Sequence, residues 1–90
     1  MRRVRLLISG RVQGVGYRWF AREQARELGI RGWVRNLPDG NVEVAAEADA
    51  EPLARFVDRL RSGPPGANVA AVRELDAPDD QVPDAFTIRR

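Results

Sequence analysis

Hydrophobic and polar residues alternate over the first positions of the chain and then give way to a glycine-rich stretch. The alternation predicts a strand over Val4–Ser9. The segment Gly10–Arg18 follows, with three glycines within seven positions. A helix is predicted over Arg18–Leu28, and Gly29 marks its expected end. Trp19 lies off the apolar stripe of this helix, and its role stays open. The stripe expected to face the core is Phe20, Ala21, Ala25 and Leu28. The glycine-rich segment is therefore predicted to be a turn between a strand and a helix.

The rest of the chain continues with segments whose apolar residues repeat with the period of a strand or of a helix. Proline and glycine in Leu37–Gly40 predict a tight turn, and proline and glycine in Ser62–Ala67 predict a loop. The elements predicted after Gly29 are, in order, strands Ile30–Asn36 and Asn41–Ala48, a helix with N-cap Asp49 and the apolar stripe Leu53, Phe56, Val57 and Leu60, strand Val69–Leu75, an acidic loop Asp76–Asp84, and a short strand Phe86–Arg89.

The predicted order of elements is β-α-β-β-α-β with a short strand at the end. Two interleaved right-handed crossovers in this order predict an α+β fold, the ferredoxin-like βαββαβ sandwich. We expect an antiparallel sheet of strand order 4-1-3-2 with both helices on one face, and the short fifth strand at the edge beside the second. Residues 1–90 are expected to form a single domain, because a chain of this length builds one core.

The glycine-rich turn has the chemistry of an anion site. Glycine allows positive φ angles, so that successive backbone N–H groups can point into one concavity. The helix that follows adds unpaired N–H groups, and Arg18 adds a planar fork of charged donors. This favours a phosphate or a similar oxyanion, although a glycine-rich turn also serves simply to reverse a chain. The known phosphate motifs do not fit, because the chain has no lysine and Trp19 stands where a dinucleotide fingerprint needs glycine.

A second group is expected beside this turn. In the predicted fold the first two strands are parallel, with one strand between them, so their ends lie about 10 Å apart at one edge of the sheet. Arg18 begins the helix at that edge, and Asn36 closes the second strand there. An arginine, a nest of N–H groups and a carboxamide are thus expected to converge on one anion.

Composition narrows the chemistry further. The chain has no cysteine and no histidine, which removes the usual metal ligands, the common general base and any disulfide; no metal and no cofactor is expected. Residues 1–35 carry nine arginines and two glutamates, a net charge of +7, whereas residues 36–90 have a net charge of −5. This charge predicts a positive field near the turn. The apolar run after the basic start is too short for a signal peptide or a membrane span, so a cytoplasmic protein without a membrane partner is expected.

Two segments carry a resemblance to a known family. Gly10–Arg18 reads G-R-V-Q-G-V-G-Y-R, and Gly32–Asn36 reads G-W-V-R-N. They resemble the G-x-V-Q-G-V-x-[FY]-R loop and the G-W-V-x-N strand end of the acylphosphatase family, at the family's separation. The similarity runs over essentially the whole chain. One departure is Arg90, where relatives often end in an aromatic residue.

The resemblance implies an acylphosphatase, which hydrolyses an acyl phosphate to a carboxylate and phosphate. It implies that Arg18 binds the phosphate and that Asn36 positions the attacking water. A carboxylate leaves without being protonated, so a site without histidine, cysteine or metal suffices. Inorganic phosphate or sulfate is expected to compete with the substrate. The backbone N–H groups expected to hold the phosphoryl oxygens are those of Gln13, Gly14, Val15, Gly16, Tyr17 and Arg18.

Two other classes of function stay open at this point. A ferredoxin-like sheet rich in arginine can bind RNA, but the third predicted strand lacks the aromatic residues that stack on bases, so no nucleic-acid partner is expected. The other class is a catalytically idle acylphosphatase-like domain that serves a larger assembly, as related domains do in multidomain proteins such as hydrogenase-maturation factors. Our expectation is a monomeric enzyme.

Overall fold

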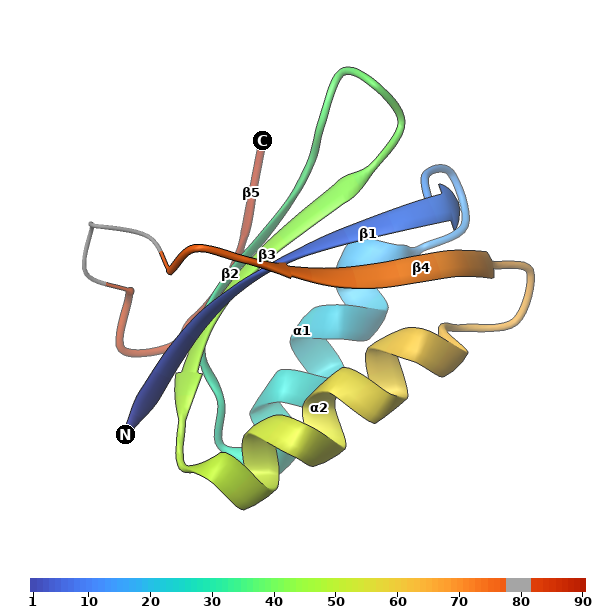
Figure 1. The fold of residues 1–90 in the computed structure, drawn as a ribbon. Helices are drawn as coiled ribbons and strands as arrows, with labels where there is room; N and C mark the ends of the chain where they lie inside the picture. Colours follow the sequence, from blue (N-terminus) through green and yellow to red (C-terminus); the bar gives the residue numbers. More distant parts are fainter. Residues whose placement is uncertain (78–81) are drawn as a thin grey trace.

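The computed structural model describes residues 1–77 and 82–90 and shows one sheet with two helices (Figure 1). The predicted elements are confirmed, with small shifts at their ends; the part of the predicted acidic loop at 78–81 lies outside the described residues. The elements are β1 (Arg2–Arg11), α1 (Tyr17–Leu28), β2 (Arg31–Asn36), β3 (Val42–Ala48), α2 (Ala50–Ser62), β4 (Asn68–Leu75) and β5 (Phe86–Arg89).

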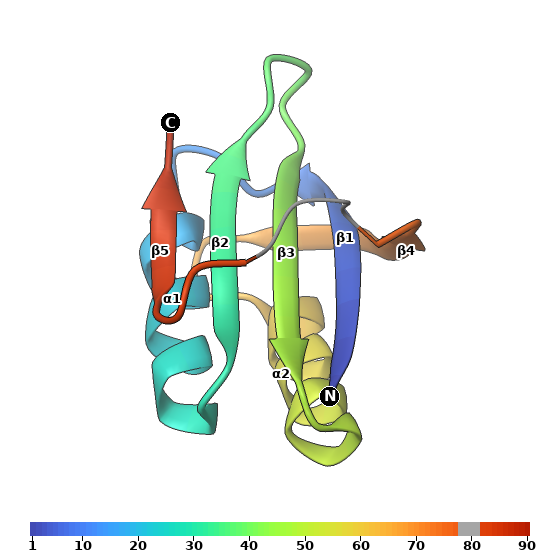
Figure 2. The same cartoon turned by 90° about the vertical axis from the view of Figure 1, so that its left-hand side faces the viewer.

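The strands follow the predicted order, β4-β1-β3-β2-β5. The direction of one strand differs from the predicted antiparallel sheet. Strand β5 pairs with β2 in parallel, with Val34 opposite Ile88. The reason lies in the preceding strand. Since β4 is antiparallel to β1, it ends at the edge where β2 begins, and the chain must enter β5 from that edge. Figure 2 shows the arrowheads of β1, β2 and β5 at the same end of the molecule.

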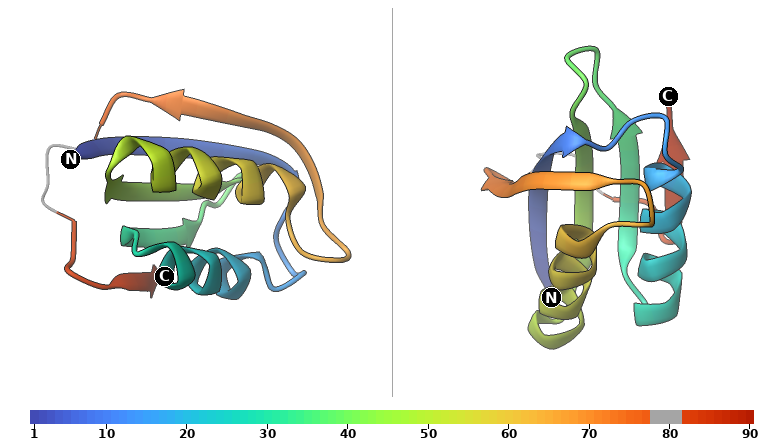
Figure 3. Two further views of the ribbon diagram at one scale, coloured as in Figure 1. Left: turned by 90° about the horizontal axis from the view of Figure 1, so that it is seen from below. Right: turned by 90° about the vertical axis from the view of Figure 1, so that its right-hand side faces the viewer.

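Both helices cover one face of the sheet, as predicted. They lie behind the sheet in Figure 2 and in front of it in the opposite view (Figure 3, right). The inward residues of the central strands are almost fully buried against them. A buried side chain of this kind contributes about 1.5–3 kcal/mol. The core residues that carry this packing are Val4, Leu6, Ile8, Val34, Val42, Val44, Ala46, Leu53, Phe56, Leu60 and Phe86.

Helix α1 is anchored by a residue outside the predicted apolar stripe. Tyr17 begins the helix with its ring 1% exposed, and its hydroxyl donates a 2.6 Å hydrogen bond to the carbonyl oxygen of Leu60 in α2. Phe20, which was predicted to face the core, is only partly buried. The helix ends as predicted at Gly29, whose N–H donates to carbonyl oxygens of the last turn. The first turn of α1 is therefore fixed against the end of α2.

The other face of the sheet carries charges. Glu43 and Glu47 point to this open face as expected for their strand. Glu43 is nevertheless only 6% exposed, because arginines from both neighbouring strands lie over it. Arg35 donates a 2.6 Å hydrogen bond to Glu43, and Arg5 approaches its other oxygen at 3.7 Å.

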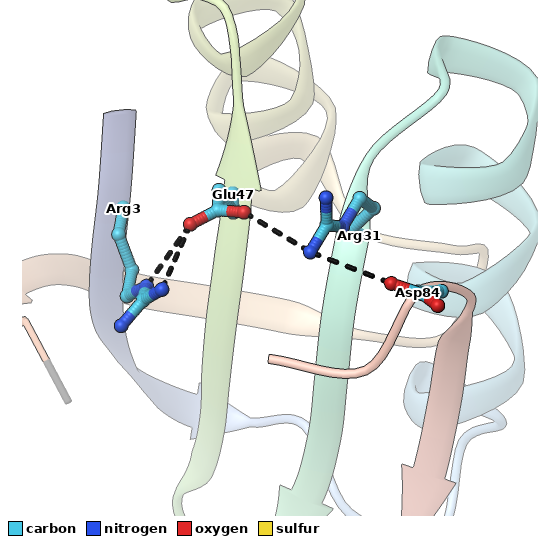
Figure 4. Close-up of polar contacts among 4 residues, drawn as sticks. All are labelled: Arg3, Arg31, Glu47 and Asp84. Atoms are coloured by element: carbon cyan, nitrogen blue, oxygen red, sulfur yellow. Dashed lines mark hydrogen bonds and ion pairs between the residues drawn. The ribbon is translucent and has the colours of Figure 1, made fainter. Parts of the chain in front are cut away.

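Glu47 belongs to a series of ion pairs that joins β1, β3 and β2 to Asp84, two residues before β5 (Figure 4). Arg3 donates two hydrogen bonds to Glu47, at 3.1 and 3.0 Å. Arg31 lies 3.3 Å from Glu47 and 3.6 Å from Asp84. The arginines Arg3, Arg5, Arg31 and Arg35 are thus paired with acids from residues 36–90. The expected positive field of residues 1–35 is therefore partly neutralised by β3.

We predict a loss of stability at alkaline pH that depends on Tyr17. Burial raises the pKa of its phenol above the usual value near 10, which the unfolded chain retains. Above that pH the unfolded state loses a proton that the folded state keeps, so the free energy of unfolding falls by about 1.4 kcal/mol per pH unit. The sequence contains no lysine, histidine, cysteine or second tyrosine to titrate there.

The measurement is urea unfolding at several pH values between about 9 and 11.5. The matched variant Tyr17→Phe loses the hydrogen bond to Leu60, which lowers stability by about 1 kcal/mol at neutral pH, but it should lose the alkaline slope as well. Equal slopes in the two proteins would contradict the prediction.

Candidate active site

An open pocket of about 510 Å³ lies where the loop after β1 meets the start of α1. Figure 2 shows this loop passing behind the ends of β3 and β2 to reach α1 beside β5. The pocket is large enough for a small molecule and not only for a single ion. Its lining comes from the loop, the first turn of α1, the end of β2 and the end of β5: Val12, Gln13, Gly14, Gly16, Tyr17, Arg18, Trp19, Asn36, Ile88 and Arg90.

The loop holds a series of backbone donors without acceptors. Gly14 and Gly16 both have φ of 77°, the left-handed conformation predicted for glycines at this turn. Gly16 is the N-cap of α1, and no side chain caps that helix end. Within the described residues, no N–H of residues 13–18 donates a hydrogen bond. Such a loop and helix end attract an anion.

The side chain of Gln13 braces this loop. Its Nε2 donates two 2.8 Å hydrogen bonds, one to the carbonyl oxygen of Leu37 and one to that of Asn41. Both carbonyls belong to the turn between β2 and β3, directly after Asn36. The contact therefore fixes the distance between the loop and the end of β2. Sequence reasoning used only the backbone of Gln13, and nothing in the sequence indicated that its side chain reaches this turn.

Asn36 brings an unsatisfied acceptor to the pocket. It closes β2 opposite Val42, as predicted, and lines the pocket together with Arg18. Its carbonyl oxygen Oδ1 is buried but accepts no hydrogen bond from any described residue. A buried polar atom without a partner costs about 1–3 kcal/mol. A bound molecule or water that donates to Oδ1 would remove this cost.

Arg18 supplies an uncompensated cation. Within the described residues it takes part in no ion pair and no hydrogen bond, in contrast to the arginines of the open face. In the described part of the chain, no aspartate or glutamate lines the pocket. An anion that enters the pocket would thus meet Arg18 without competition from a carboxylate.

Two of the predicted loop residues serve the core with their side chains. Val15 is absent from the pocket lining, and its side chain packs against the core. Tyr17 lines the pocket, but its hydroxyl is held by Leu60 and burial raises its pKa, so the phenol stays protonated at neutral pH. The predicted role of these two residues concerns only their backbone N–H groups, which donate to no described residue.

Sequence reasoning did not place Val12, Ile88 and Arg90 in this pocket, and it left the role of Trp19 open. Trp19 lies outside the apolar stripe of its helix, and that is the one local signal that the sequence offered for it. Ile88 and Arg90 reach the pocket only because β5 pairs with β2. That pairing joins residues far apart in the sequence, so no local pattern revealed it.

Among residues 1–77 and 82–90, no three histidine, cysteine, aspartate or glutamate side chains gather as a metal site would require. In the same part of the chain, neither helix has the length and apolar character needed to cross a bilayer.

The fold and pocket define a ferredoxin-like α+β sandwich with a glycine loop and an arginine at the start of its first helix. The family model for acylphosphatase matches residues 4–88. The chain therefore belongs to the acylphosphatase family and is a hydrolase.

Similar proteins agree with this assignment. An acylphosphatase of Methylococcus capsulatus is 54% identical over 77 residues, which are 83% of this chain and 84% of the relative. The crystal structure of acylphosphatase from Bacillus subtilis matches all of both chains with a TM-score of 0.86 and 35% identity. HypF of T. kodakarensis also contains the fold, with a TM-score of 0.82 and 29% identity over 98% of this chain but only 12% of HypF.

We predict that Gln13→Ala lowers the free energy of unfolding by about 1–2 kcal/mol, because it removes two hydrogen bonds between the loop and the turn. Each carbonyl keeps one backbone donor, the N–H of Gly40 for Leu37 and the N–H of Leu37 for Asn41. Urea denaturation measures the change. The matched control is Gln24→Ala, which removes a single bond accepted from Arg59 between the helices and should cost less. A smaller loss for Gln13→Ala than for Gln24→Ala would contradict the bracing role.

Proposed function

We propose that this chain hydrolyses acyl phosphates to a carboxylate and phosphate by attack of water on phosphorus. The observation that carries the proposal is that Arg18 and Asn36 line one pocket together with the loop whose N–H groups are free. The Oδ1 of Asn36 is buried and has no hydrogen-bond partner among the described residues. Family membership supports the substrate class, since the relatives are named acylphosphatase.

In this mechanism the loop binds the phosphoryl group. The N–H groups of residues 13–18 donate to its oxygens, and the guanidinium of Arg18 neutralises its charge. Phosphoryl transfer proceeds through a loose transition state, for which positioning and charge stabilisation matter more than covalent help. The loop is held in place before substrate arrives by the side chain of Gln13. Donors that need no rearrangement stabilise the transition state most effectively.

Asn36 positions the nucleophile. A water that donates a hydrogen bond to Oδ1 is held beside the phosphoryl group, with a lone pair free to attack phosphorus. The new bond joins the water oxygen to phosphorus, and the bond from phosphorus to the acyl oxygen breaks with its electron pair staying on the carboxylate. The products are a carboxylate and dihydrogen phosphate, so both protons of the water remain on phosphate.

No general acid is needed at the leaving group. The conjugate acid of a carboxylate has a pKa near 4, so the carboxylate departs as an anion at neutral pH. The phenol of Tyr17, the one titratable non-arginine side chain in the lining, is committed to Leu60. Such a site suits an acyl phosphate and is poorly equipped for a phosphate monoester, whose alkoxide is a much worse leaving group.

We predict that Arg18→Ala and Asn36→Ala each lower kcat for benzoyl phosphate by about 10²–10³-fold, because each removes one group that acts on the transition state. Matched controls are Arg22→Ala, one helical turn further along α1, and Asn41→Ala, whose side chain bonds only within its turn. Both controls should keep most of the activity. Wild-type turnover by folded Asn36→Ala would remove the role given to that residue.

We also predict that inorganic phosphate and sulfate inhibit competitively, since a tetrahedral oxyanion fits the same donors. The apparent KM should rise with inhibitor while kcat stays constant, and chloride at matched ionic strength should have little effect. Arg18→Ala should raise the inhibition constant of phosphate at least tenfold by the loss of a charged donor (about 1.5–3 kcal/mol). Non-competitive inhibition would place the anion elsewhere.

A further inference from the structure

The mouth of the pocket combines apolar and charged surface. Among the described residues, the large hydrophobic side chains that stay exposed are Met1, Trp19 and Ile88. Two of these three, Trp19 at 58% and Ile88 at 37% exposure, line this pocket. They come from different elements, the first turn of α1 and strand β5. Apolar side chains left exposed together at a pocket indicate a binding surface.

Arg90 stands at the same wall. Side chains alternate between the two faces along a strand, so Phe86 and Ile88 of β5 share one face, and Arg90 follows directly after the end of β5 at Arg89. Phe86 on that face is buried against the helices, whereas Arg89 on the other face lies over the ring of Trp33 at 4.7 Å. Arg90 accordingly lines the pocket beside Ile88 and, within the described residues, has no ion pair or hydrogen bond. The pocket thus holds a second cation besides Arg18.

We propose that Trp19, Ile88 and Arg90 form the subsite for the acyl group, and that Arg90 makes the enzyme prefer acyl phosphates whose acyl part ends in a second anionic group. This inference rests on the proposed function, because it assigns the part of the pocket that the phosphoryl group leaves free. The phosphoryl group is bound at the loop and Arg18. A short acyl chain then extends over the apolar side chains, and its far end meets Arg90.

The chemistry of the lining supports this division. A neutral acyl chain gains only apolar contact with Trp19 and Ile88, whereas a terminal carboxylate also gains a charged partner. Among residues 1–77 and 82–90, no aspartate or glutamate lines the pocket to compete for Arg90. Since Arg90 is exposed, the gain is that of a solvent-accessible ion pair and weakens as salt is added.

The test compares two substrates of equal chain length, succinyl phosphate with a terminal carboxylate and butyryl phosphate with a terminal methyl group. We expect the wild-type protein to have the higher kcat/KM for succinyl phosphate, mainly through a lower KM. Arg90→Gln should lower the ratio of the two kcat/KM values about three- to fivefold. Arg89→Gln is the matched control, because it removes the same charge one residue away on the opposite face and should leave the ratio unchanged.

The outcomes separate this inference from the function on which it rests. Hydrolysis of both substrates with a ratio that Arg90→Gln does not change would overturn the subsite and leave the hydrolase proposal standing. An equal loss for both substrates in Arg90→Gln would place Arg90 on the shared phosphoryl group and also overturn it. An equal fall of the ratio in Arg89→Gln would show that any positive charge at this end of the chain has the same effect, and it would overturn the role given to Arg90. Hydrolysis of neither substrate by the wild-type protein would overturn both proposals.

Discussion

The two hydrogen bonds from the side chain of Gln13 to the turn between β2 and β3 hold the candidate site together. Among the described residues, no other side-chain hydrogen bond joins the loop after β1 to that turn, and the glycines of the loop do not restrict its backbone. With the tie in place, the free N–H groups of the loop and the carboxamide of Asn36 lie on one pocket. The side chain of Gln13 thereby determines where the N–H groups of the loop lie relative to Asn36.

The charged and polar groups of the open sheet face differ from those of the pocket in whether they have partners. On the open face, Glu43 and Glu47 pair with arginines of β1 and β2, and Trp33 lies under two guanidinium groups. At the pocket, Arg18, Arg90 and the Oδ1 of Asn36 have no such partners among the residues that the structure describes. Positive charge is therefore available at the pocket and largely compensated on the open sheet face, which favours binding of a small anion at the former.

Strand β5 links the core to the rim of the pocket. Phe86 packs edge-on against Phe56 with ring centroids 5.6 Å apart, so the beginning of the strand is fixed in the core. Two residues further on, Ile88 faces the pocket, and Arg90 continues on the same side. The parallel pairing with β2 brings this rim beside Asn36. Strand β5, of four residues, thus holds Ile88 at the pocket, and Arg90 follows directly after the strand at the same pocket.

The sequence by itself determined the order of the elements, the sandwich and the identity of the loop, because periodicity, glycines and caps act over a few neighbouring residues. It also indicated Arg18 and Asn36, since each closes a local motif. It did not determine the direction of β5, the burial of Glu43, the reach of Gln13 or the place of Arg90. Most of these features depend on contacts between residues 24 or more positions apart, such as Gln13 with Leu37. The burial of Glu43 depends on arginine side chains from the two neighbouring strands. Only the packed chain brings these groups together.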